Sequence, residues 1–408
     1  MPKYFPPSYT PLMEQKQTER AIKFIKDTFE RELSGGLRLS RVTSPRFVKA
    51  GAGINDDLNG VERPVRFEVG NLGNQEMEVV QSLAKWKRMA LADHGYAPGT
   101  GIYTDMDAIR PDDVLDAIHS IYVDQWDWEL TITEAERNLD FLKAVVRKIY
   151  SAMIRTEFLV SEMFPVCRPL LPKEITFIHT EDAQREYPQL APEDRERVLA
   201  KRYGAIFLIG IGSPLADGKS HGGRAPDYDD WSTPSGNGYT GLNGDIVVWD
   251  SVRGDSMELS SMGIRVDRET LIRQLAIRGM EERASLYWHQ RLLGGELPLS
   301  IGGGFGQSRL CMYLLKKGAV SDGKQAAPRV QLLGSGTIFR EVIAAADLLK
   351  NDWGVDADIW GCPSMNELSR NGNDVSRWNL LNPAEKPKLS HVEACLNDTR
   401  GPVIAATD

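Results

Sequence analysis

One eleven-residue stretch, HSIYVDQWDWE at residues 119–129, restricts the possible folds of this chain more than any other feature. Alternate side chains of a β-strand share a face, so Gln125, Asp127 and Glu129 are expected on one side and Trp126 and Trp128 on the other. A face that carries an amide and two acids is not a core face. The pattern predicts a strand with a functional polar side, and a solvated edge strand is the alternative.

Other alternating segments predict further strands, namely RPVRFEV, GAIFLIGIG and GDIVVWD. Apolar residues at three-to-four spacing predict an amphipathic helix over residues 18–33. A second helix is predicted to begin at Thr133, with Glu136 completing a capping box. Grouped strands flanked by helices indicate an α+β fold with an antiparallel sheet, rather than a βαβ repeat.

The chain changes character near residue 325. The segment RVQLLGSGTIFREVIAAADLLKNDWGVDADIW contains a strand, a glycine turn, a helix and a second strand, which is a βαβ pattern. We therefore expect two domains, residues 1–325 and a partial α/β domain at residues 326–408.

The composition excludes several classes of protein. The 408 residues carry a formal net charge of −8, which argues against a nucleic-acid partner, since such proteins need a basic surface. No stretch of eighteen apolar residues occurs and the amino terminus has no apolar signal region, so we expect no membrane span and a cytoplasmic location. The cysteines are widely spaced and are interpreted as buried thiols: Cys167, Cys311, Cys362 and Cys395.

The segment RAPDYDDWS, residues 224–232, crowds an arginine, three aspartates and two aromatic residues together. An exposed loop could carry these acids at little cost because salt screens them. Alternatively, the acids hold a substrate ammonium or a metal. Arg110 shortly precedes the strand at 119–129, where it can grip a phosphate or carboxylate while acids hold an ammonium group. Such a site suits a zwitterion together with a nucleotide.

Two segments of the chain resemble signature motifs of class II aminoacyl-tRNA synthetases. Arg110 with the strand QWDWE is similar to motif 2, and GGGFGQSRL at 302–310 is similar to motif 3. Six segments in order resemble ammonia-dependent asparagine synthetase, also called aspartate–ammonia ligase, over roughly residues 8–316: GINDDLNG, EVVQSLAKWKR, HSIYVDQWDWE, RAPDYDDWS, ELSSMGIRVD and IGGGFGQSRL.

The resemblance implies that aspartate, ATP and ammonia give asparagine, AMP and pyrophosphate through a β-aspartyl-adenylate. It also implies that Arg110 and Mg²⁺ meet the charge at the α-phosphorus, with Asp245 and Glu258 as magnesium ligands. Asp56 and Gln125 are implied near the β-carboxylate, where ammonium is caught and deprotonated.

The same resemblance implies which residues bind aspartate and which bind the nucleotide. Ser82 and Lys87 take the α-carboxylate of aspartate, and Asp127 and Asp229 take its α-ammonium group. The residues implied on the nucleotide side are Tyr228, Ser261, Arg265 and Arg309. A homodimer is implied as well.

Free ammonia is the expected nitrogen source, since Pro2 follows the initiator methionine and no cysteine lies in a nucleophile elbow. The chain departs from the family at Gln81, where histidine is usual, and a short segment after GQSRLCMYLL is missing. The last 80 residues instead resemble part of the C-terminal domain of the homodimeric pyruvate dehydrogenase first component. A class II synthetase-like adenylating enzyme and a catalytically impaired chimera are the alternative functions.

Overall fold

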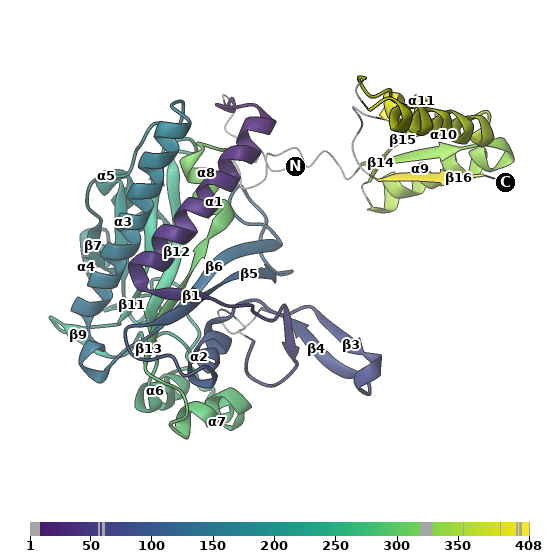
Figure 1. The fold of residues 1–408 in the computed structure, drawn as a ribbon. Helices are drawn as coiled ribbons and strands as arrows, with labels where there is room; N and C mark the ends of the chain where they lie inside the picture. The colour runs from purple at the N-terminus through teal and green to yellow at the C-terminus, as the bar shows by residue number, and fades with distance from the viewer. Residues whose placement is uncertain are drawn as a thin grey trace. The chain divides into compact units, whose positions relative to one another are not determined.

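A computed structural model of the chain describes residues 9–55, 58, 62–318, 329–353, 355–383, 385–396, 399 and 402–407. The chain forms two compact units, Met1–Val320 and Ser321–Asp408, which we describe separately (Figure 1). Among the described residues, no helix is both long enough and apolar enough to cross a membrane.

An eight-stranded sheet forms the centre of the first unit. Its strands in spatial order are β1 (Leu39–Arg41), β5 (Gly101–Ile109), β6 (Tyr122–Thr131), β13 (Ser300–Gly306), β12 (Asp255–Ile264), β11 (Asn243–Asp250), β8 (Ala205–Ile209) and β7 (Thr176–His179). The six inner strands pair antiparallel, and only β1 and β7 at the two edges run parallel to their neighbours in this sheet. The predicted antiparallel sheet of an α+β fold is confirmed.

Smaller elements surround this sheet. The helices are α1 (Gln15–Leu37), α2 (Ala84–Asp93), α3 (Leu139–Met163), α4 (Thr180–Glu186), α5 (Pro192–Tyr203), α6 (Arg268–Arg278), α7 (Tyr287–Leu293) and α8 (Gln307–Leu314), with 3-10 turns at η1 (Gly70–Leu72), η2 (Glu134–Glu136) and η3 (Glu281–Ser285). Three short strands form a second sheet, in the order β2 (Phe47–Lys49), β4 (Gln75–Val79) and β3 (Arg66–Val69), and β9 (Pro234–Gly236) pairs with β10 (Tyr239–Thr240).

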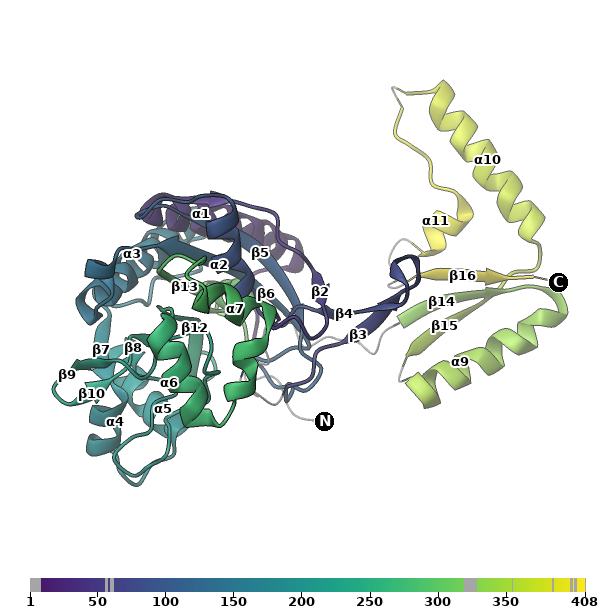
Figure 2. The same ribbon diagram turned by 90° about the horizontal axis from the view of Figure 1, so that it is seen from below.

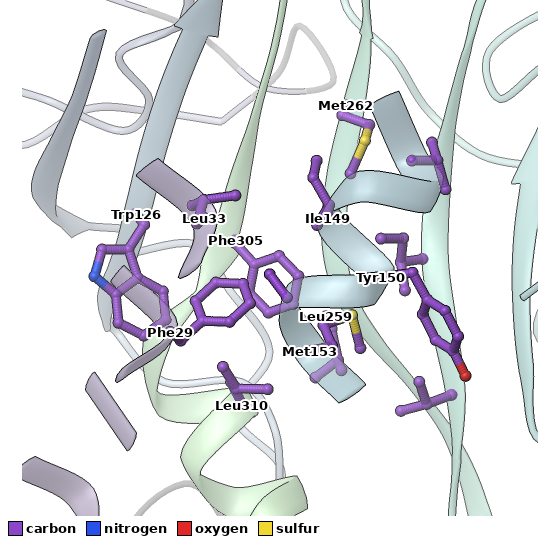
Figure 3. Packing of buried hydrophobic residues seen from close by; sticks show 14 of the residues in the cluster. Phe29, Leu33, Trp126, Ile149, Tyr150, Met153, Leu259, Met262, Phe305 and Leu310 are labelled. Atoms are coloured by element: carbon purple, nitrogen blue, oxygen red, sulfur yellow. The ribbon is translucent and has the colours of Figure 1, made fainter. Parts of the chain in front are cut away.

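The two long helices α1 and α3 pack side by side on one face of the sheet (Figure 1). The ring of Phe29 on α1 lies 4.9 Å from that of Trp126 on β6 and 4.5 Å from that of Phe305 on β13 (Figure 3). Ile149 and Met153 of α3 belong to the same buried cluster. The apolar stripe predicted at residues 18–33 therefore covers this face, and the helix extends beyond both predicted ends.

The alternation predicted for β6 is present, but the edge-strand interpretation is wrong. β6 lies inside the sheet between β5 and β13. Trp126 and Trp128 join the core beneath α1 and α3, while Asp127 and Glu129 are only 2% and 0% exposed. Both faces of β6 are therefore buried, one among apolar groups and one among charges.

The second predicted helix begins later than expected. Glu136 accepts a hydrogen bond from the backbone N–H of Thr133 at 2.8 Å, but this capping box stabilises only the 3-10 turn η2. The α-helix α3 begins at Leu139, where the side chain of Asn138 accepts a hydrogen bond from the N–H of Phe141. Asn138 is itself a strong N-cap residue, so two start signals compete within six residues and the later one opens the helix.

The second unit has a three-stranded parallel sheet. Its elements are β14 (Arg329–Gly334), η4 (Gly336–Ile338), α9 (Phe339–Trp353), β15 (Asp356–Gly361), α10 (Met365–Leu381), α11 (His391–Leu396) and β16 (Val403–Ala406). β14 lies between β15 and β16, so the predicted βαβ pattern at β14, α9 and β15 is correct. Figures 1 and 2 show α9 and α10 on opposite sides of this sheet. Leu332, Val342 and Ala346 form its small buried cluster.

Candidate active site

The glycines of β13 leave room for the charged face of β6. In the antiparallel register Gly302 lies opposite Glu129, and Gly304 lies opposite Asp127. A Cβ atom on Gly302 would overlap the Glu129 carboxylate, and one on Gly304 would lie 2.7 Å from Oδ1 of Asp127. The carboxylates of β6 therefore require glycine at positions 302 and 304, whereas the close approach of β12 requires it at 303.

Lys87 reaches these carboxylates from α2. Its Nζ lies 3.2 Å from Oδ2 of Asp127 and 4.0 Å from Oε2 of Glu129, and it donates a hydrogen bond to the carbonyl of Gly303 at 3.0 Å. Burial lowers the pKa of Lys87, and the two carboxylates oppose that shift. Lys87 and Asp127, both predicted to hold aspartate, are thus brought together.

Arg265, at the end of β12, connects two acids. Its Nε and Nη2 donate to the Glu129 carboxylate at 3.0 and 2.8 Å, and its Nη1 forms an ion pair with Asp229. Ser300 donates a further hydrogen bond to Glu129 at 2.7 Å. Burial favours a raised pKa for Glu129, but Arg265 and Lys87 hold that pKa below its ordinary value. The guanidinium also lies 5.9 Å from the ring of Tyr228. Arg265 therefore lies among the residues predicted for aspartate.

The acids of RAPDYDDWS are buried, so the interpretation as an exposed loop is wrong. Besides Arg265, Asp229 contacts Arg224, whose Nε lies 3.4 Å from its Oδ2. Asp230 forms an ion pair with Arg137. The aspartates are therefore crowded together because each is paired with a different cation of the chain.

Asp245 and Glu258 lie on the neighbouring strands β11 and β12. Asp245 forms an ion pair with Arg224 and lies opposite Ser261 in the register. Burial raises the pKa of Asp245 to about 7, with the charge of Glu258 adding to the rise and Arg224 opposing it. Arg309 donates to the backbone carbonyl of Glu258 at 3.0 Å, and its Nη1 lies 3.7 Å from the Glu258 carboxylate. Four predicted residues are thus neighbours here.

These two carboxylates fit a magnesium ion by their chemistry. Mg²⁺ is usually held by one or two protein carboxylates together with substrate phosphates. A cation between Asp245 and Glu258 would offset the repulsion from Glu258, which adds to the effect of burial in raising the Asp245 pKa. Within the described residues no cluster of three or more histidine, cysteine, aspartate or glutamate side chains could hold a metal alone. Phosphate oxygens would have to complete the coordination.

Arg110 is held by the segment before α2. It directly follows β5, and its Nε and Nη2 donate to the backbone carbonyl of Gln81 at 3.3 and 3.1 Å. Gln81 is anchored in turn, because its N–H donates to Oδ1 of Asn55 at 2.9 Å and its Nε2 donates to the carbonyl of Arg63 at 3.0 Å. The network around Glu129 consists of four carboxylates (Asp127, Glu129, Asp229 and Asp245) and three cations (Lys87, Arg224 and Arg265). Among the described residues, no hydrogen bond or ion pair joins Arg110 to this network.

The remaining predicted residues have varied positions. Gln125 lies on the same side of β6 as Asp127, and its Oε1 faces Gly304. The hydroxyl of Ser82 accepts a hydrogen bond from the N–H of Ala84 at 3.2 Å, at the start of α2. Asp56 lies outside the described residues.

Two residues were given no role of their own from the sequence: Glu129, and Gln81, which stood out only as a departure from the family. Arg224 was expected to fix the geometry of the neighbouring acids, and it pairs with Asp229 and Asp245. The alternation of β6 placed Glu129 on the polar face, which was a usable signal, but its role as the centre of a buried network depends on Arg265, 136 positions away. The role of Gln81 comes from its backbone carbonyl, which the identity of its side chain does not reveal.

The comparison with known families decides the identity of the first unit. The family described as aspartate-ammonia ligase matches residues 16–327. The chain belongs to the aspartate–ammonia ligase family. It is 58% identical over 317 residues to the aspartate–ammonia ligase of Parabacteroides distasonis, covering 78% of this chain and 92% of that protein. The ligase of Clostridium perfringens is 49% identical over 319 residues, with the same coverage.

Solved structures give the fold class of this family member. The asparaginyl-tRNA synthetase of Pyrococcus horikoshii complexed with asparaginyl-adenylate superposes with a TM-score of 0.56 at 17% identity, covering 74% of this chain and 67% of that one. The Entamoeba histolytica enzyme gives 0.54 at 16% identity, covering 75% and 66%. At these identities the likeness shows a class II synthetase fold and no activity. Residues 311–408 match the transketolase-like C-terminal domain family.

Proposed function

We propose that the first unit forms L-asparagine from L-aspartate, ammonia and ATP, releasing AMP and pyrophosphate. The supporting observation is the network of alternating cations and carboxylates around Glu129, in a chain 58% identical to a named aspartate–ammonia ligase. Lys87 would bind the α-carboxylate of aspartate with Ser82, and Asp127 and Asp229 would bind its α-ammonium group. The β-carboxylate is then the end left to react.

In the first step an oxygen of the β-carboxylate attacks the α-phosphorus of ATP and pyrophosphate leaves. Arg110, held by the carbonyl of Gln81, would stabilise the charge that develops on the phosphate oxygens. Arg309, Ser261 and Tyr228 would line the nucleotide. Mg²⁺, held by Asp245 and Glu258, would neutralise phosphate charge when bound.

In the second step ammonia attacks the activated carbonyl carbon, and AMP leaves with the electrons of the broken carbon–oxygen bond. Ammonium must lose a proton first, and we propose that Asp56 and Gln125 hold it near the β-carboxyl end. Arg265 lies beside Asp229 and Glu129, so we propose that it orients the aspartate-binding residues as well as contacting the nucleotide.

The assignment extends to the organisation of the protein. We propose that residues 1–325 are the catalytic domain of a cytoplasmic homodimer. Residues 326–408 would be part of a domain like the C-terminal domain of the pyruvate dehydrogenase first component, with no role in the reaction.

One assay tests the function and its rivals. The full chain is incubated with aspartate, ammonium chloride, ATP and MgCl₂, and asparagine, AMP and pyrophosphate are quantified. Equal amounts of the three products, with none when aspartate is omitted, are expected without any tRNA. Release of pyrophosphate without asparagine would favour an adenylating enzyme of another kind, and a folded protein that releases no pyrophosphate and makes no asparagine would favour an impaired chimera.

A further inference from the structure

Helix α2 buries three cations within ten residues, although only one of them reaches the network around Glu129. Lys85, Lys87 and Arg88 are 2%, 1% and 1% exposed. Burying an ion costs several kcal/mol unless partners compensate, so each must be held by specific groups. Arg88 donates to the backbone carbonyls of Pro298 and Val266 at 2.8 and 2.6 Å. Arg88 thus fixes the helix to the segments that flank β13 and β12.

Lys85 is directed to a different partner, the first aspartate of RAPDYDDWS. Its Nζ lies 2.9 Å from Oδ2 of Asp227, which is fully buried. The same oxygen accepts a hydrogen bond from Nε2 of His289 on α7 at 2.9 Å. The neighbouring Trp288 donates from its indole nitrogen to the carbonyl of Lys85, also at 2.9 Å. Helix α7 therefore holds both members of the ion pair.

Asp227 is ionised in this arrangement. Burial alone would raise its pKa, but Lys85 and His289 together hold the pKa well below its usual range. The 3.5 Å approach of Arg283 to the same oxygen acts in the same direction. A buried carboxylate so strongly held is a fixed point for the loop that carries it.

The ion pair joins two segments that carry aspartate-binding residues. Lys87 lies two residues after Lys85 on α2, and Asp229 lies two residues after Asp227 in the loop. Helix α6 holds the same loop from another direction, because Nε2 of Gln274 donates to the carbonyl of Asp229 at 3.0 Å. That contact fixes the loop to α6, whereas the pair of Lys85 and Asp227 fixes it to α2.

We propose that Lys85 and Asp227 are positioning residues for aspartate: their buried ion pair sets the placement of Lys87 relative to Asp229, and hence the affinity for the amino acid. The inference rests on the proposed roles of Lys87 and Asp229. Neither Lys85 nor Asp227 belongs to the groups placed on the nucleotide side, and of those groups only Tyr228 lies on the same loop. The affinity for aspartate is therefore expected to depend on the ion pair much more than the affinity for ATP does.

Steady-state kinetics of the full chain test this proposal. In Asp227→Asn and in Lys85→Met, the KM for aspartate is expected to rise about tenfold or more. A binding group that is misplaced by about 1 Å can lower the activity of an enzyme by about a hundredfold. The KM for ATP should stay within about twofold of wild type. Lys85→Arg keeps a cation beside Asp227, so it should bind aspartate almost as well as wild type does. If Lys85 acted only through packing, restoring the charge in this way would not restore the affinity for aspartate.

The matched control is Asp93→Asn. Asp93 is the last residue of α2 and pairs with Arg291 of α7 at 2.7 Å, so the same two helices are joined by a half-exposed ion pair away from the site. Its loss should leave both KM values unchanged. An equal rise of both KM values in Asp227→Asn, or no rise in the KM for aspartate, would overturn the proposal.

Two further variants separate a failure of this proposal from a failure of the proposed function and from a failure to fold. If Lys87→Met binds aspartate normally, the proposed binding role of Lys87 fails, which is distinct from a failure of Asp227→Asn alone. If Asp227→Asn does not fold, His289→Leu removes one donor while keeping the ion pair. A rise of about threefold in its KM for aspartate supports the proposal, and an unchanged KM contradicts it.

Discussion

Replacing Glu129 with glutamine tests the buried network directly. The substitution keeps the size of the side chain and one acceptor oxygen but removes the charge that Arg265 and Lys87 share. Arg265 retains Asp229, and Lys87 retains Asp127 at 3.2 Å. Removing one partner of a buried ion pair typically lowers the free energy of unfolding by about 3–5 kcal/mol. The partners that Arg265 and Lys87 retain make this loss smaller. We expect Glu129→Gln to lower the free energy of unfolding by about 2–3 kcal/mol at pH 7.

The pH dependence of this difference has a definite sign. The pKa of Glu129 is lower in the folded protein than its ordinary value, so its charge contributes stability above the pKa of the unfolded chain, about 4.3. That contribution is lost as the pH falls through the lower pKa of the folded state. The difference between wild type and Glu129→Gln should therefore be constant from pH 7 to 5 and shrink below about pH 4.

Urea denaturation followed by tryptophan fluorescence measures this difference, because Trp126 and Trp128 lie on the opposite face of the same strand. Glu76→Gln is the control: it removes a glutamate that pairs with Arg66 at 3.5 Å while half exposed, and should cost less than about 1 kcal/mol. A loss in Glu129→Gln no larger than in the control, or one that persists unchanged at low pH, would refute the role of Glu129 as the centre of the network.

Four other outcomes are expected. Arg110→Ala should lower turnover about a hundredfold or more, the usual scale for losing one preorganised charge partner, and near-normal turnover would remove Arg110 from the mechanism. Gly302→Ala should lower the free energy of unfolding by about 1–3 kcal/mol in thermal denaturation and abolish asparagine synthesis, since its Cβ overlaps Glu129; an active, equally stable variant would contradict the packing. Light scattering at micromolar concentration should show a homodimer, and a monomer would refute this. Truncation after Ala326 should leave asparagine synthesis and its ATP dependence unchanged; inactivity of a folded truncated protein, or binding of thiamine diphosphate by the full chain, would show that the tail has a function.

Local pattern predicted the elements of the site well. The alternation around Asp127 identified a strand with opposite polar and apolar faces, because a period of two is a property of the extended backbone itself. What the pattern did not reveal was burial. A row of acids indicates a solvated face unless cations from elsewhere neutralise it, and here those cations come from α2 and from the end of β12.

Long-range pairing also explains which groups surround Arg265. The resemblance implies a role for Arg265 with the nucleotide, which stays a prediction, and in the fold Arg265 lies between Glu129 and Asp229, which are 136 and 36 positions away in the chain. The antiparallel order β6, β13, β12 brings Arg265 to Glu129, and a separate backbone bridge places Asp229 opposite Arg265. The prediction that the second helix begins at Thr133 was wrong for a local reason. A second N-cap residue, Asn138, follows the capping box closely, and the α-helix begins directly after it.

The charge of the network determines what else the reaction needs. Three cations, Lys87, Arg224 and Arg265, face four carboxylates, Asp127, Glu129, Asp229 and Asp245, which leaves an excess of one negative charge when all are ionised. Aspartate adds one net negative charge and ATP adds several more. Charges in a buried site interact more strongly than charges in water, so this network cannot supply the attraction that ATP requires. In the proposed mechanism the positive charge comes from Arg110, Arg309 and a divalent cation held by Asp245 and Glu258, and such a cation would offset the repulsion that adds to burial in raising the pKa of Asp245.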